Sequence, residues 1–151
     1  MIVLCYDGSA CAKHAITCAH ATIGQAQALL LHIWEPPESY LGPDPFPQIA
    51  ELEAVASERA KRTLGYGVEL AREAGFEVEG RLERSSLTVW RTILDVAEES
   101  DAQLIVVGAR GHSALESLLL GDVSSALVHH STRPTLVVPL PASTASDDVE
   151  R

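Results

Sequence analysis

Basic side chains are scarce in this sequence. Its 151 residues include 21 acidic side chains but only 11 Lys or Arg, for a formal net charge of −10. Because nucleic acids and anionic lipid surfaces attract proteins largely through basic charge, this balance argues against both as partners. No apolar run approaches the ~18 residues that a membrane-spanning helix needs, so we expect no membrane partner.

Cysteine is also sparse. Cys5, Cys11 and Cys18 are odd in number and lack the Cys-x-x-Cys spacing of zinc and redox sites. We therefore expect reduced thiols and no metal site. The adjacent His129 and His130 would point to different sides of a helix, which is poor geometry for chelation. The N-terminus has no signal-peptide pattern, so we expect a cytoplasmic protein.

Motifs of common catalytic sites are missing as well. There is no Walker Gly-Lys-Ser/Thr sequence and no Gly-x-Ser-x-Gly nucleophile elbow. A response-regulator receiver would need Asp at the end of its third strand, where Arg84 lies, and Lys after its fifth strand. No Lys follows Val138. Since nothing pairs a nucleophile with a base, we predict no catalytic residue.

What the sequence does contain is an alternation of apolar runs and helical stripes. Strands are predicted over residues 2–6, 28–34, 76–84, 103–107 and 135–138, and helices over 10–23, 49–74, 88–100 and 122–131. This order predicts an α/β domain with a five-stranded, mostly parallel sheet and helices on both faces. The alternating polarity of the third strand suits a sheet edge.

The domain is expected to span residues 1–140. Residues 141–151 are small, polar and acidic, and predict a flexible tail. Residues 35–48 hold five prolines, which exclude a regular helix and predict an exposed loop.

Three predicted strands end at residues that mark a binding site. Asp7 follows the first strand in an Asp7-Gly8-Ser9 turn with a helix cap, Ile33 ends the second, and Gly108 ends the fourth. Ligands of parallel sheets lie at the carboxyl ends of the strands, near a switch in strand order. These residues are therefore expected on one ligand-binding rim.

The segment after the fourth strand is rich in glycine. Gly108, Gly111 and Gly121 have the spacing Gly-x-x-Gly-x(9)-Gly, and the third directly precedes a predicted helix. Glycines let main-chain N–H groups approach an anion, and a helix N-terminus adds free donors and a positive dipole end. The pattern predicts a phosphate site, although Gly108 could simply end a strand and Gly121 simply precede a helix.

Together these features resemble the universal stress protein family in its single-domain form. The resemblance covers about residues 2–139 and is carried by five stretches, namely residues 3–9, 30–33, 104–111, 118–121 and 133–139. It implies a Rossmann-like domain of the adenine nucleotide alpha hydrolase-like kind, usually dimeric. In one subgroup of the family, ATP is bound on the glycine pattern.

The resemblance also implies which residues would bind the nucleotide. The main chain near Cys5 and the side chain of Asp7 would border the adenosine, and Ile33 would contact the base. The phosphates would be held by the glycine loop and the following helix start, with the residues Gly108, Arg110, Gly111, His112, Gly121, Asp122, Val123 and Ser124. Two alternatives stay open, since Asp7 could be only a turn residue and Arg110 only a solvated one.

One position departs from the family pattern. Ser or Thr follows the third glycine in the ATP-binding members, whereas this sequence has Asp122. Asp can cap a helix as well as Ser and suits the helix dipole. Beside a phosphate, two unit charges ~4 Å apart would repel by up to about 4 kcal/mol at an effective dielectric of ~20. A Mg²⁺ ion between them would reverse this sign.

The expected ligand is therefore ATP, with or without Mg²⁺, or a nucleotide with fewer phosphates such as AMP or cyclic AMP. Two other functions remain open. Asp122 could fill the phosphate position of a nucleotide-free interaction module, whose acidic surface or residues 35–48 would meet a partner. The protein could also be a weak ATPase. The family resemblance implies a homodimer paired through the strand Thr135–Val138, an edge that would otherwise invite association.

Overall fold

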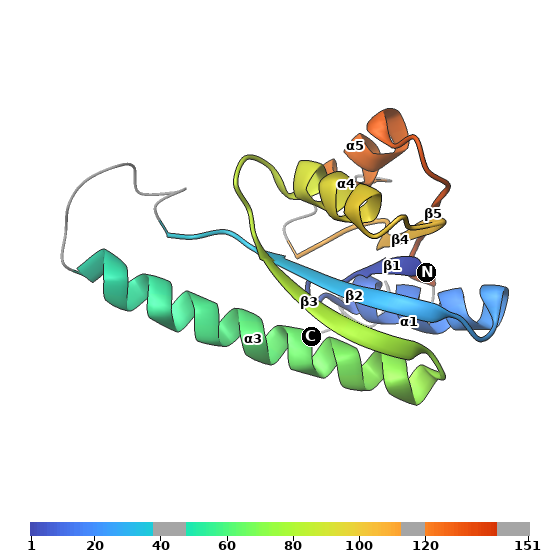
Figure 1. The fold of residues 1–151 in the computed structure, drawn as a ribbon, viewed down its shortest axis with the longest axis horizontal. Helices are drawn as coiled ribbons and strands as arrows, with labels where there is room; N and C mark the ends of the chain where they lie inside the picture. The colour runs from blue at the N-terminus through green and yellow to red at the C-terminus, as the bar shows by residue number, and fades with distance from the viewer. Residues whose placement is uncertain (38–47, 113–119, 142–151) are drawn as a thin grey trace, which may run out of the picture.

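The computed structural model describes residues 1–37, 48–112 and 120–141 and shows a parallel sheet between two helical layers (Figure 1). The strands are β1 Ile2–Cys5, β2 Gln27–Trp34, β3 Glu77–Arg84, β4 Leu104–Gly108 and β5 Thr135–Val138. The helices are α1 Ala10–Ile23, α3 Gln48–Ala74, α4 Val89–Glu99 and α5 Asp122–His130. The predicted five-stranded α/β fold is confirmed, and each boundary lies within one residue of its prediction.

Three predicted features fall at least partly outside the described residues. These are most of the proline-rich segment (38–47), the middle of the glycine loop (113–119) and nearly all of the acidic tail (142–151).

The order of the strands fixes where the chain changes direction. All neighbours pair in parallel in the order β3-β2-β1-β4-β5. The chain moves outward from β1 to β3 and then returns to the other side of β1 at β4. The switch in strand order therefore lies between β1 and β4, the strands that end at Asp7 and Gly108. The third strand is an edge, as its alternating polarity predicts.

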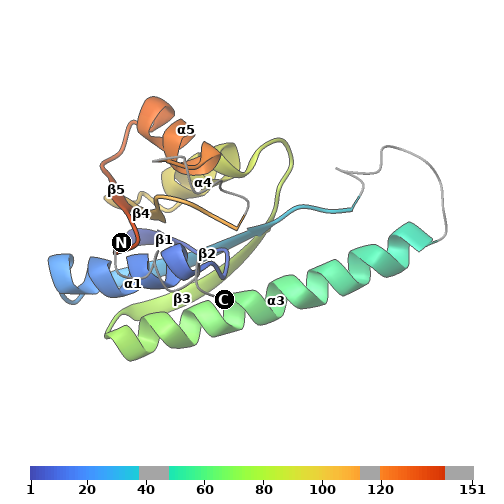
Figure 2. The same ribbon diagram turned by 180° about the vertical axis from the view of Figure 1, so that it is seen from behind.

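Helices cover both faces of the sheet (Figure 2), and each face has its own apolar core. On one face, Leu4 packs with the residues of α1 and α3. On the other, Val3 packs with Leu127 of α5 and with residues of α4. Adjacent residues of a strand point to opposite faces, so β1 supplies both cores.

The turn between β1 and α1 is held by its own side chains. The Ser9 N–H donates to Asp7 Oδ1 over 2.9 Å, and the Ser9 hydroxyl accepts from the Ala12 N–H over 3.2 Å. Ser9 is therefore the N-cap of α1, as predicted. Gly8 in this turn has a φ of +82°, a conformation that favours glycine. The turn leaves Asp7 at the carboxyl end of β1.

Helix α3 runs unbroken through Gly65 and Gly67, although two glycines weaken a helix. A Cβ atom on Gly67 would lie 2.5 Å from Tyr6 Cδ1 and 2.8 Å from Leu30 Cδ2. The missing side chain lets α3 approach the sheet at this point. Gly65 has no such neighbour, since its Cβ would meet nothing within 4 Å.

We expect Gly67→Ala to lower the free energy of unfolding by about 1–3 kcal/mol, because the added methyl overlaps Tyr6 and Leu30. Gly65→Ala is the matched control and should raise that free energy by up to about 1 kcal/mol through helix propensity. Urea unfolding followed by circular dichroism measures both. Equal stabilisation by the two substitutions would contradict the close contact.

Candidate functional site

Two cavities open at the carboxyl ends of the strands. The rim cleft has a volume of about 750 Å³ and lies at the ends of β1 and β4, against α4 and α5. The α3 pocket has a volume of about 770 Å³ and lies between α3 and the ends of β1 and β2. Four residues line both cavities, namely Tyr6, Asp7, Glu35 and His112.

All the predicted site residues line the rim cleft. They are Cys5, Asp7, Ile33, Gly108, Arg110, Gly111, His112, Gly121, Asp122, Val123 and Ser124. The cleft thus joins the ends of three strands, the described parts of the glycine loop and the start of α5, at the switch in strand order. That these residues contact a ligand stays a prediction.

One wall of the cleft was missed by the sequence reasoning. It comes from the segment between β3 and α4 and from the first turns of α4, and includes Leu87, Val89, Trp90 and Ile93. This segment follows the carboxyl end of β3, so it emerges at the same rim. Its place after a strand predicts that the segment emerges at the rim, but nothing in the sequence predicts that Trp90 packs against the cleft.

Asp7 connects the end of β1 to the glycine loop. The Nε2–H of His112 donates to the Asp7 carbonyl oxygen over 2.7 Å. A Cβ atom on Gly111 would lie 2.8 Å from Asp7 Oδ2, so that carboxylate oxygen packs directly against the Gly111 main chain. Asp7 is a turn residue through Oδ1, which accepts from Ser9, while Oδ2 faces the loop.

The start of α5 is anchored to the end of β4 through one carbonyl group. The Gly121 N–H and the Ser124 hydroxyl both donate to the Ala109 carbonyl oxygen, each over 2.7 Å. Ser124 is 2% exposed, so its hydroxyl serves this anchor. These bonds fix the helix N-terminus beside the glycine loop.

The prediction that Asp122 caps α5 is wrong. Gly121 is the N-cap residue, with φ −77° and ψ 170°, and Asp122 is the first helical residue. Its exposed carboxylate still lies in the first turn, where the helix dipole favours negative charge. Because Asp122 also lines the rim cleft, its charge would face an anion bound there.

Burial shifts the pKa values of three polar groups at the ends of β1 and β2. Burial raises the pKa of the Cys5 thiol to about 12, and the negative charge of Asp7 adds to the shift. Burial and Asp7, in the same order, also raise the pKa of Tyr6. His32 donates its Nδ1–H to the Tyr6 carbonyl oxygen over 2.8 Å, yet burial lowers its pKa. At neutral pH these groups are therefore uncharged.

Two further observations concern metals and membranes. Within residues 1–37, 48–112 and 120–141, no group of three or more His, Cys, Asp or Glu could hold a metal ion. In the same ranges, no helix is long and apolar enough to cross a membrane. All three cysteines are free thiols, with Cys11 buried and Cys5 and Cys18 half-buried.

The raised pKa of Cys5 predicts slow alkylation of this thiol. In a Cys11→Ala/Cys18→Ala variant, the iodoacetamide rate at pH 8 should be about a thousandfold lower than in the urea-unfolded chain, whose thiol titrates near 8.5. The logarithm of the folded-state rate should rise with pH and reach no plateau by pH 10. Asp7→Asn should speed the reaction modestly. A folded-state plateau near pH 9 would contradict the shift.

Known proteins resemble this chain in sequence and in fold. The universal stress protein family model matches residues 1–139. A universal stress protein of Thermus aquaticus is 37% identical over 142 residues, which cover 91% of this chain and 96% of that protein.

Two solved structures share the fold. A universal stress protein of Archaeoglobus fulgidus in complex with dAMP has a TM-score of 0.61 and 23% identity, over 91% of this chain and 95% of that one. A universal stress protein family protein of Arabidopsis thaliana with AMP bound has a TM-score of 0.64 and 14% identity, over 95% and 93%. Because the family model matches nearly the whole chain and the Thermus aquaticus relative is 37% identical, this chain belongs to the universal stress protein family.

Proposed function

We propose that this protein binds an adenine nucleotide in the rim cleft and acts as a cytoplasmic stress-response or signalling protein, not as a metabolic enzyme. The observation that carries the proposal is the convergence of strand ends, glycine loop and α5 start on one cleft of about 750 Å³. That volume is within the usual range for small-molecule sites. The dAMP and AMP complexes of the two proteins with this fold support an adenine nucleotide as the ligand.

The adenosine would lie at the strand ends. Ile33 is half-buried on the α4 face of the sheet and offers an apolar contact for the base. Trp90 packs against the same core and lines the same cleft. The Asp7 carboxylate, next to Gly111, is placed to accept from ribose hydroxyls or from the adenine amino group.

The phosphates would lie between the glycine loop and α5. The Gly121 N–H already donates to Ala109. The N–H groups of Asp122, Val123 and Ser124 belong to the first helical turn, which has no partners for them within the helix. With the positive end of the helix dipole, they favour an anion. Arg110 lines the cleft and adds a positive charge.

The Asp122 carboxylate works against a highly charged ligand. Its repulsion grows with the number of phosphates near the start of α5. Mg²⁺ bound to the phosphates would reduce this repulsion, since a carboxylate is a ligand that Mg²⁺ accepts. We therefore propose ATP with Mg²⁺, or a nucleotide with fewer phosphates such as AMP or cyclic AMP.

Asp122→Ser should tighten the binding of ATP by about ten- to thirtyfold in the absence of Mg²⁺, because only the phosphates meet the lost charge. Adenosine affinity should stay the same, and the gain should shrink when Mg²⁺ is present. Isothermal titration of both ligands measures this. Asp95→Ser is the control, because it removes one exposed charge of α4 outside the cleft.

The same titrations separate the other two functions. Equal effects of Asp122→Ser on ATP and adenosine would show that residue 122 does not lie beside the phosphates. No heat with ATP, with or without Mg²⁺, would favour a nucleotide-free interaction module. Binding of ATP followed by release of inorganic phosphate would favour a weak ATPase.

We also propose a homodimer that pairs through β5. This strand is an edge of the sheet, and its residues Leu136 and Val137 are only half-buried in the single chain. A second copy across a two-fold axis would cover this apolar edge. Light scattering at micromolar concentration should give twice the chain mass of 16.2 kDa. A species with the mass of one chain would contradict the dimer.

A further inference from the structure

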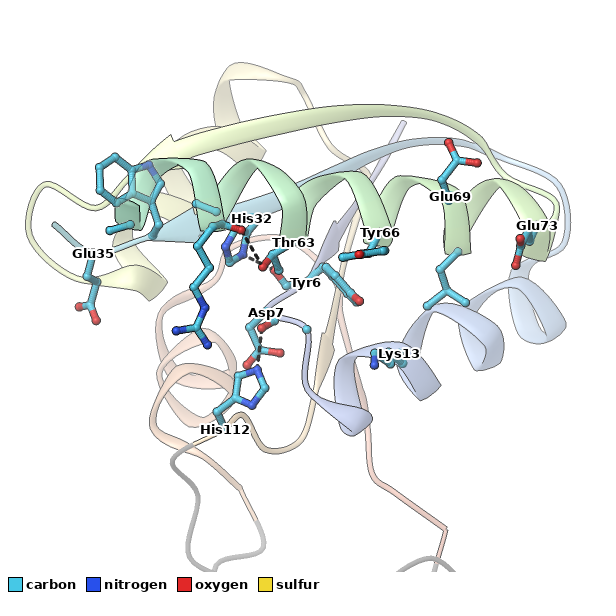
Figure 3. Close-up of a pocket in the computed structure, with 16 residues that line it drawn as sticks. Tyr6, Asp7, Lys13, His32, Glu35, Thr63, Tyr66, Glu69, Glu73 and His112 are labelled. Atoms are coloured by element: carbon cyan, nitrogen blue, oxygen red, sulfur yellow. Dashed lines mark hydrogen bonds between the residues drawn. The ribbon is translucent and has the colours of Figure 1, made fainter. Parts of the chain in front are cut away.

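The α3 pocket is a second cavity, on the face of the sheet opposite α4 and α5. Its walls are the inner face of α3, the start of α1 and the ends of β1 and β2 (Figure 3). Neither the glycine loop residues Gly108 and Gly111 nor the start of α5 line it. The cavity therefore lies apart from the proposed phosphate site, although Asp7 and His112 border both.

Two buried side chains turn polar atoms without partners toward this pocket. Tyr6 is 4% exposed and His32 is 9% exposed. Among the described residues, neither the Tyr6 hydroxyl nor His32 Nε2 forms a hydrogen bond. Every fully enclosed side-chain nitrogen or oxygen in the described ranges has a partner, so neither of these two atoms is fully enclosed. His32 lines the α3 pocket and not the rim cleft, so its Nε2 opens onto the α3 pocket, whereas Tyr6 lines both cavities.

The atoms around them are mainly hydrogen-bond acceptors. A carbonyl oxygen only accepts, so His32 carries its proton on Nδ1 and keeps a lone pair on Nε2. Thr63 donates its hydroxyl proton to the Arg59 carbonyl oxygen over 3.1 Å, which leaves its oxygen as an acceptor. The Asp7 carboxylate is a third acceptor. A ligand that matches this wall must supply donors.

The charge of the lining favours a cation. Four carboxylates line the pocket, against two permanently charged basic side chains, Lys13 and Arg59. Glu69 is paired with Arg72, whereas Glu73 has no ion-pair partner among the described residues. The exposed ring of Tyr66 lies between these glutamates and Thr63 along α3 (Figure 3) and offers a surface for methylene groups or a cation.

The acceptors form two groups. His32 donates to the carbonyl oxygen of Tyr6, the residue before Asp7. A Cβ atom on Gly8, the residue after Asp7, would lie 3.4 Å from Thr63 Cγ2, so these acceptors belong to the same end of the pocket. Figure 3 shows Glu69 and Glu73 farther along α3. Thr63 and Glu73 both line the pocket and are ten residues apart on α3, which corresponds to about 15 Å along the helix axis. A ligand that meets both groups must be elongated and carry donors at both ends.

We propose that the α3 pocket binds a linear organic polyamine. One ammonium group donates to His32 Nε2, Thr63 Oγ1 and the Asp7 carboxylate. Another lies near Glu73, and the methylene chain between them packs on Tyr66. Lys13 and Arg59 are exposed, so their side chains can turn toward solvent when the ligand enters. The proposal does not rest on a nucleotide in the rim cleft, but the two sites share Asp7, so a bound nucleotide would compete for this carboxylate.

Isothermal titration of nucleotide-free protein with spermine at low ionic strength tests the proposal. We expect one saturable site. Thr63→Val keeps the shape of the side chain but removes its acceptor, and should weaken binding about tenfold. Glu73→Gln should weaken it about threefold. Glu98→Gln is the matched control, because Glu98 is also the exposed second-to-last residue of its helix, outside the pocket.

Unchanged affinity for Glu98→Gln, with the two losses above, would support the pocket site. Equal weakening by Glu73→Gln and Glu98→Gln, or no effect of either pocket variant, would place spermine on the general acidic surface and overturn the proposal. So would a titration without saturable heat. Glu73 is exposed, so its variant tests the site even where Thr63→Val disturbs folding.

Discussion

The short turn after β1 holds the carboxyl-end rim of the sheet together. Within four residues it caps α1 through Ser9, accepts the His112 ring at the Asp7 carbonyl oxygen and accepts the His32 ring at the Tyr6 carbonyl oxygen. These bonds join the central strand to α1, β2 and the glycine loop, which are far apart in the sequence. The positive φ of Gly8 makes the turn tight enough to bring them together.

The pleat of the sheet then divides this rim into two chemical environments. Cys5 and Ile33 point toward α4 and α5 and face a cleft with an apolar wall and a helix N-terminus. Tyr6 and His32, one residue away on each strand, face α3 and a pocket rich in acceptors. A shift of one residue in either strand would exchange the two sets. Strand register therefore decides which chemistry each cavity has.

Asp122 illustrates how a local and a functional requirement can differ at one position. A carboxylate in the first turn of α5 stabilises the helix dipole, and this effect needs no ligand. The same carboxylate lines the cleft where phosphates would lie. Since Gly121 is the N-cap and Ser124 anchors the helix, the helix start does not need Asp122 as a cap. A substitution that changes the charge at position 122 would therefore leave the start of the helix in place.

The sequence by itself determined the strands, the helices and most residues of the rim. Apolar periodicity is a local property, and the carboxyl ends of parallel strands meet at one edge, so the amino-acid order alone places Asp7, Ile33 and Gly108 together. The resemblance to the family predicted that the start of α5 would join these residues in one cleft. The tertiary structure alone decided that Gly67 must lack a side chain, that Trp90 forms a cleft wall and that Tyr6 and His32 open onto a second pocket. Those features depend on how closely α3 and α4 approach the sheet, and that distance is set by side chains from segments remote in the sequence, which no local pattern records.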